Sequence, residues 1–199
     1  DVDATLTGVV DMDASSDKAI SAIVVAASAS VSAASGSGAS VALTGAGTRS
    51  YNETENSVLA VIRNAEVHAA GDVTLDAVDS TTISATLVAA AASVGVSGSG
   101  ASGALTVTVS DADNDITNTT RAVIEGASTV ESAGGNLRLD ASSDGSITAT
   151  AIAASVGVGV GGGQVSLTGA GAGANATNAI TNTIEAGVIG DSTVVVDGD

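Results

Sequence analysis

Apolar and polar residues alternate with a period of two along much of this chain. The pattern is clear in VTLDA (73–77), ISATL (83–87), ALTVTV (104–109) and RAVIE (121–125). Such alternation is typical of a β-strand, whose successive side chains point to opposite faces. The Ala-rich stretch LVAAAAS (87–93) would also suit a helix, but the Val, Thr, Ser and Gly around it favour strand. The pattern therefore predicts an all-β protein.

The alternating segments belong to a sequence repeat that occurs three times. One motif appears as DMDASSDKAISA (11–22), TLDAVDSTTISA (74–85) and RLDASSDGSITA (138–149), anchored by Asp13, Asp76 and Asp140. An Ala/Ser/Gly tract follows each copy. Two Asn residues four apart come next, and then Ala with Val or Ile. These Asn pairs are Asn52 and Asn56, Asn114 and Asn118, and Asn178 and Asn182.

The repeat period of about 63 residues is too long for one usual solenoid rung. It predicts several stacked rungs of β-strand in each repeat. We expect an elongated β-solenoid (β-helix) with units at 1–72, 73–136 and 137–199, joined without separate globular domains. Known solenoid periods suggest two or three rungs of roughly 20–30 residues in each unit. The Asn and anchoring Asp residues are assigned to corners, and Ile116 is expected to point inward between Asn114 and Asn118.

Composition limits the interior and the partners. The chain has 25 Gly, one Tyr, one Met and no Cys, Pro, Phe or Trp, so its core must consist of small side chains. Its net charge is −17 with five basic residues, which makes nucleic acid a poor partner. The uncharged runs 19–48, 80–110 and 145–184 are rich in Ser, Thr and Gly, so membrane insertion is not expected.

Candidate chemistry is sparse. Asp111, Asp113 and Asp115 have the alternate spacing of calcium ligands, and calcium is the only cofactor the sequence suggests. Ile116 and Ala122 occupy the positions where an EF-hand loop needs Gly and an acid, so a looser calcium site or a solvated acidic turn are the alternatives. No catalytic residue is assigned, since the chain has one His (His68) and no Cys.

The order of motifs resembles a known family. LDA…ISA, then the Ala/Gly tract, then N-x-x-x-N and AVI is similar to repeats of filamentous-haemagglutinin-like and leukotoxin-like filamentous adhesins, which are large secreted bacterial exoproteins. The resemblance covers essentially the whole chain. It implies a β-helical stalk at the cell surface, used in adhesion or in building an extracellular matrix, and it brings no catalytic residue.

Three functional hypotheses follow. The first is a non-catalytic stalk or fibre segment of a secreted or cell-surface bacterial protein with an unknown receptor. Its partners would be neighbouring repeats of a longer chain, or copies joined end to end or side by side. The second is a calcium-stabilised or ice-binding module, for which Thr106 and Thr108 would share a face. The third is a β-helical polysaccharide-acting enzyme, for which residues 111–115 are the only cluster that breaks the repeat.

Overall fold

The computed structural model describes residues 2–162 and 165–197, and all regular structure in these ranges is β-strand. Within them, no helix has the length and hydropathy needed to cross a bilayer. The strands in chain order are β1 (Val2–Leu6), β2 (Val10–Ala34), β3 (Ser40–Arg63), β4 (Ala65–Ala69), β5 (Val73–Ser97), β6 (Ser102–Glu125), β7 (Thr129–Ser132), β8 (Leu137–Gly161), β9 (Ser166–Val188) and β10 (Thr193–Val196).

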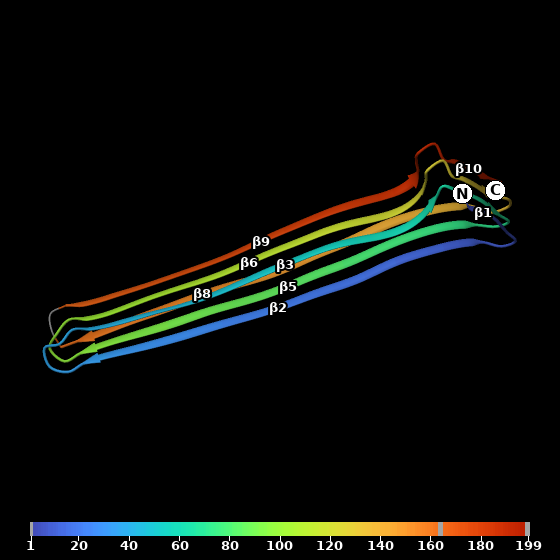
Figure 1. Ribbon diagram of the computed structural model, residues 1–199. Coiled ribbons are helices and arrows are strands. Elements are labelled where there is room, and N and C mark those ends of the chain that lie inside the picture. The colour runs from blue at the N-terminus through green and yellow to red at the C-terminus, as the bar shows by residue number, and fades with distance from the viewer. Residues whose placement is uncertain (1, 163–164, 198–199) are drawn as a thin grey trace.

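The strands form three parallel sheets that wind as a solenoid (Figure 1). One sheet is short, with the order β1-β4-β7-β10, and two are long, with the orders β2-β5-β8 and β3-β6-β9. Each coil contains one short strand followed by two long ones. The predicted all-β solenoid of about three repeats is confirmed.

The predicted number of rungs per repeat is wrong, because each repeat forms a single coil. The strand pattern continues without a break for 25 residues in β2, β5 and β8, where rungs of 20–30 residues would need several corners. Glycines that could have marked such corners, including Gly157 and Gly159, lie within β8 instead.

Equivalent residues of successive repeats lie side by side in the sheets. Asp13 pairs with Asp76, and Asp76 pairs with Asp140, so the three form a row across β2, β5 and β8. Strands β5 and β8 begin at Val73 and Leu137, where the second and third predicted units begin. Within the paired strands, each residue thus lies beside its counterpart in the neighbouring coil.

The molecule is elongated along its strands, not along the direction in which coils stack (Figure 1). A strand of 25 residues spans about 80 Å, whereas each coil adds about 4.8 Å. The short sheet lies at one end, here called the terminal end, where β1 begins and β10 ends. The turns that join β2 to β3 and β5 to β6 lie at the other end, here called the distal end, where β8 ends and β9 begins.

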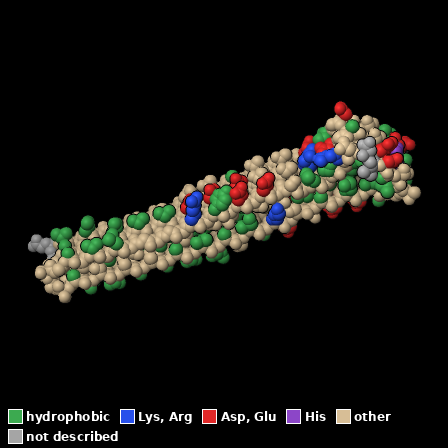
Figure 2. Space-filling model, viewed as in Figure 1, with side chains coloured by type: hydrophobic (Ala, Val, Ile, Leu, Met, Phe, Trp, Pro, Cys, Tyr) green, Lys and Arg blue, Asp and Glu red, His purple; other side chains and the backbone are tan. Residues whose placement is uncertain are grey.

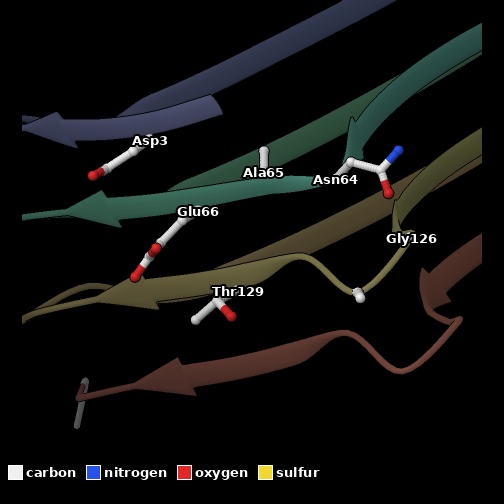
Figure 3. Close-up of a pocket in the computed structure, with 7 residues that line it drawn as sticks. Asp3, Asn64, Ala65, Glu66, Gly126 and Thr129 are labelled. Carbon is white, nitrogen blue, oxygen red and sulfur yellow. The ribbon is translucent and has the colours of Figure 1, made fainter. Parts of the chain in front are cut away.

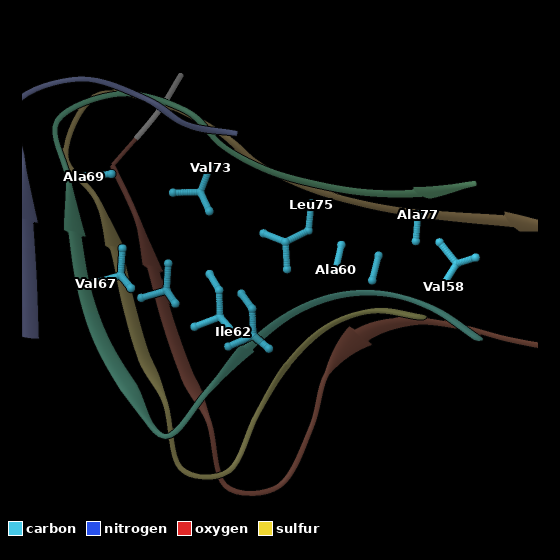
Figure 4. Close-up of a cluster of buried hydrophobic side chains, with 11 residues drawn as sticks. Val58, Ala60, Ile62, Val67, Ala69, Val73, Leu75 and Ala77 are labelled. Atoms are coloured by element: carbon cyan, nitrogen blue, oxygen red, sulfur yellow. The ribbon is translucent and has the colours of Figure 1, made fainter. Parts of the chain in front are cut away.

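The core differs between the two ends. At the terminal end the short sheet closes a third side, and the enclosed space holds large apolar side chains, among them Ile62, Val67, Val73, Leu75 and Ile124 (Figure 4). Towards the distal end the two long sheets face each other directly. Buried side chains there are small or hydroxyl-bearing, such as Ala89, Ser93, Ala104 and Thr106.

Candidate functional site

The three carboxylates of the predicted calcium site lie on the outer face of β6. Asp111, Asp113 and Asp115 alternate with inward-facing residues along a straight strand. Asp111 lies 3.5 Å from Arg49 Nε in β3 and accepts a hydrogen bond of 3.0 Å from Asn175 Nδ2 in β9. The three carboxylates therefore lie on a strand, whereas a turn or loop was expected.

This setting does not bring the three carboxylates together. Alternate residues of a strand are about 6.6 Å apart, so the Cα atoms of Asp111 and Asp115 are about 13 Å apart. Oxygens that share one calcium ion lie within about 2.6 Å of it. In the described ranges, no group of three or more His, Cys, Asp or Glu side chains is placed to hold a metal ion. Calcium binding stays a prediction for which the structure shows no preformed geometry.

Acidic side chains also surround Tyr51, next to this row. The Tyr51 hydroxyl donates a hydrogen bond of 2.7 Å to Glu53 Oε2. This bond and the negative charge of Glu53, with smaller effects of Asp113 and Asp115, raise the pKa of Tyr51. The middle of this outer face is therefore anionic.

The anchoring Asp residues are not at corners, as was expected, but within strands. Asp13, Asp76 and Asp140 form an acidic row on the outer face of β2, β5 and β8. Arg138 reduces the repulsion within the row, since its guanidinium lies 2.5 Å from Asp140 and 3.5 Å from Asp76.

The repeated Asn residues also lie within strands and point inward. Asn52 Nδ2 donates to Asn114 Oδ1 at 2.7 Å, and Asn114 Nδ2 donates to Asn178 Oδ1 at 2.8 Å. This asparagine ladder links all three coils. The expectation that Ile116 points inward between Asn114 and Asn118 is confirmed, because all three side chains are buried.

The carboxylate of Asp79 is buried, which was not expected from the sequence. It accepts a hydrogen bond from Asn56 Nδ2, one of 3.2 Å from the Thr81 hydroxyl and one of 3.3 Å from the Ser143 hydroxyl. Its counterparts in the other coils are Ser16 and Ser143. The signal was present in the alternation, since Asp79 occupies the same phase of β5 as the buried Leu75 and Ile83.

Thr106 and Thr108 share a face, as expected, but that face is the interior. Both side chains are buried. The Thr106 hydroxyl lies 2.7 Å from that of Ser93 in the opposite sheet. This pair therefore cannot form an ice-binding surface.

A chain of ion pairs joins the coils at one corner of the terminal end. Glu125 binds Arg63 of the first coil and lies 2.8 Å from Arg121 Nη2, while Arg121 Nε lies 2.7 Å from Glu185 of the third coil. Arg121, with Arg63 as the second contributor, lowers the pKa of Glu125. Glu185 and Glu125 raise the pKa of Arg121.

His68 makes a second contact between coils. Its Nδ1 lies 2.7 Å from Glu131 Oε2 in β7, and its Nε2 lies 3.1 Å from Glu66 Oε1 in its own strand. These hydrogen bonds, that of Glu131 foremost, raise the pKa of His68. Because the folded-state pKa is raised, any stability from this contact is present below the unfolded pKa and lost as the pH rises through the folded one.

An open groove of about 450 Å³ crosses the short sheet at the terminal end (Figure 3). Asn64 and Ala127 have positive φ angles of 49° and 56°, which bend the chain between the long and short strands there. The carboxylates of Asp3 and Glu66 make the wall of the groove acidic. Its lining consists of Asp3, Asn64, Ala65, Glu66, Gly126, Ala127 and Thr129.

The end of the coil stack at β9 exposes side chains that belong to the interior elsewhere. Strands of the two long sheets pack in the staggered order β2, β3, β5, β6, β8, β9, so β9 has one facing neighbour where β6 has two. Ile116 of β6 is 0% exposed, whereas its counterpart Ile180 in β9 is 45% exposed. Thr120 is likewise 0% exposed, and its counterpart Ile184 is 49% exposed. The inner side of β9 is therefore partly exposed, because one strand faces it where two face β6.

Comparison of the chain with protein-family models, curated proteins and solved structures gives no match.

Proposed function

We propose that this chain is a non-catalytic structural segment of a secreted or cell-surface protein, in which coils stack to build a stalk, fibre or matrix. The observation that carries this proposal is the contact between coils, in which continuous backbone ladders and rows of side chains join each coil to the next.

Contacts between coils support a structural role for the stack. The asparagine ladder and the Arg63–Glu125–Arg121–Glu185 chain each link three coils through side chains. Long parallel ladders in register add backbone hydrogen bonds along the whole length of β5 and β6. In a repeat array such interfaces between neighbouring coils supply most of the stability.

The location outside the cell is supported by the sequence resemblance to filamentous adhesins. The negative charge of −17 also favours a hydrated, soluble surface. Together these features fit a spacer whose role is length and stiffness, with any receptor bound elsewhere in the assembly.

Immunogold electron microscopy of the source cells tests this proposal. Antibodies raised against the folded chain should label unpermeabilised cells, on material that extends from the surface. An in-frame deletion of residues 73–136 from the gene removes one coil, and the remaining product should still be exported and labelled. Pre-immune serum and a strain without the gene serve as controls. Label found only after permeabilisation would refute the surface location, and a soluble, non-assembled product outside the cells would refute the structural role.

A further inference from the structure

Charged side chains are confined to one part of this molecule. Residues 19–48, 80–110 and 145–184 contain no Asp, Glu, Lys or Arg. The distal parts of both long sheets belong to these runs, and in β9 the run continues to Ile184, near the terminal end. In Figure 2 acidic and basic side chains accordingly lie towards the terminal end, and the opposite end shows hydrophobic and uncharged side chains. The distal end thus differs in surface chemistry from the rest of the chain.

The distal end also inverts the usual distribution of polarity. The outer side of the β2-β5-β8 sheet at residues 23–33, 86–96 and 150–160 is here called the distal face. Its exposed side chains include Ile23, Val25, Val31, Ile152, Val156 and Val160. At the same level, the interior contains the buried hydroxyls of Ser93 and Thr106. Packed sheets normally bury their apolar side and expose the polar one, so an apolar outer face indicates a surface that is covered in use.

The size of the distal face suits a specific protein interface. Eleven residues along three strands make a footprint of about 36 by 14 Å, or roughly 500 Å². Two such faces in contact would bury at least about 1,000 Å², which is the lower bound for a specific interface. An uncharged face offers no counter-charge to a nucleic acid or to a strongly charged protein.

The shape of the distal face is complementary to a second copy of the same face. Ala27, Ala90 and Ala154 form a row that floors a hollow of about 280 Å³ on this face. Rows of Val and Ile lie two residues before this row and four residues after it. A bulky row of one copy can therefore sit in the alanine hollow of another.

We propose that two copies of this chain pair side by side through their distal faces, in antiparallel orientation. The direction follows from the acidic row Asp13, Asp76 and Asp140, which lies on the same side of the same sheet nearer the terminal end. Parallel pairing would place this row against its counterpart. Antiparallel pairing moves the two rows to opposite ends of the contact. They are then separated by far more than the Debye length of about 8 Å. The pairing is a property of the isolated chain and does not depend on the proposed location outside the cell.

Matched substitutions on β5 test the interface. Val96 lies on the distal face and Val78 lies on the same side of the same strand towards the terminal end, and they are 39% and 40% exposed. We expect sedimentation equilibrium to show a monomer–dimer equilibrium for the 199-residue chain. Val96→Glu should weaken it roughly tenfold or more, because the new charge would be buried at the contact. Val78→Glu should leave it unchanged. Circular dichroism and thermal melting establish that both variants are folded.

Spin labels test the orientation, and the absence of Cys makes single-site labelling clean. Labels on Val78→Cys should lie about 80 Å apart in the antiparallel pair, whereas in a parallel pair they would lie within about 20 Å. Ile184→Lys, on the open end of the coil stack, separates this pairing from end-to-end stacking, because it should leave the dimer intact.

Several results would overturn the proposal. These are a wild-type chain that stays monomeric to about 100 µM, equal weakening by Val96→Glu and Val78→Glu, or a short distance between the spin labels. Loss of the dimer in Ile184→Lys would assign the contact to the coil end. Binding of monomers to phosphatidylcholine vesicles that is lost in Val96→Glu would make lipid the occupant of the distal face.

Discussion

At the scale of single residues, the interior of this protein is held together by polar side chains to an unusual degree. Asn52, Asn114 and Asn178 bond to one another through the stack, and Asp79 is buried among amide and hydroxyl donors. Buried polar groups are costly when unpaired, and a shifted register would break these bonds. The polar rows therefore favour one register between neighbouring coils. A core of alanine and valine alone would specify that register only weakly.

Replacement of the central ladder residue tests this role. Asn114→Ala leaves Asn52 and Asn178 without their partner, and we expect the free energy of unfolding to fall by about 1–3 kcal/mol. Asn175→Ala is the matched control. Asn175 is exposed on β9, so its loss should change stability by no more than about 0.5 kcal/mol. Urea denaturation followed by circular dichroism measures both, and equal effects would argue against the ladder.

At the scale of the strand, period-two alternation was enough to predict the fold but not which side of each strand faces inward. In ALTVTV (104–109), hydrophobicity alone would place Val107 and Val109 in the interior. In the structure Thr106 and Thr108 are buried instead. The reason is that β6 continues without a bulge from Ile116 and Ile124, which are fixed in the core. Because side chains alternate strictly, the phase set at the terminal end is carried to the distal end.

The same continuity explains which features the sequence left undetermined. Asp13, Asp76, Asp140 and the Asn rows looked like corner residues because Asp and Asn favour turns. The number of rungs was overestimated because strands of 25 residues are far longer than the usual 3–10. Conversely, Asp111, Asp113 and Asp115 were assigned to one site from their spacing alone. A loop could bring the three carboxylates together, but a straight strand keeps them apart.

Glycine allows the two long sheets to approach closely at the distal end, and Gly95 tests this. A Cβ at Gly95 would lie 2.3 Å from the carbonyl oxygen of Gly103 in the opposite sheet. We expect Gly95→Ala to lower the free energy of unfolding by about 1–3 kcal/mol, because the backbone must move apart. Gly173→Ala is the control, since a Cβ there meets nothing within 4 Å. That variant should be neutral or more stable by up to about 1 kcal/mol. Chemical denaturation compares the two, and a tolerated Gly95→Ala would contradict the close approach.

At the scale of the whole molecule, the strands set one dimension and the number of coils sets another. The longest dimension is the length of one strand, about 80 Å, because the coils stack at right angles to it. An array with more coils would become a broader ribbon with the same length along its strands. This geometry gives each added coil two long ladders with its neighbour, which is a large interface for a repeat of about 63 residues.

Duplication of one coil tests this geometry directly. A second copy of residues 73–136, inserted after residue 136, adds one complete set of β5, β6 and β7 in the existing register. Small-angle scattering should show a cross-section about 5 Å wider and an unchanged maximum dimension of about 80 Å. The melting temperature should rise, because the new coil adds one more interface between neighbours. Duplication of residues 73–104 alone is the control, since it places a β5 copy where the fold needs a member of the other long sheet, and we expect it to aggregate or melt earlier. Growth of the maximum dimension by tens of ångströms in the full-coil variant would mean that the coils stack along the long axis, contrary to the structure.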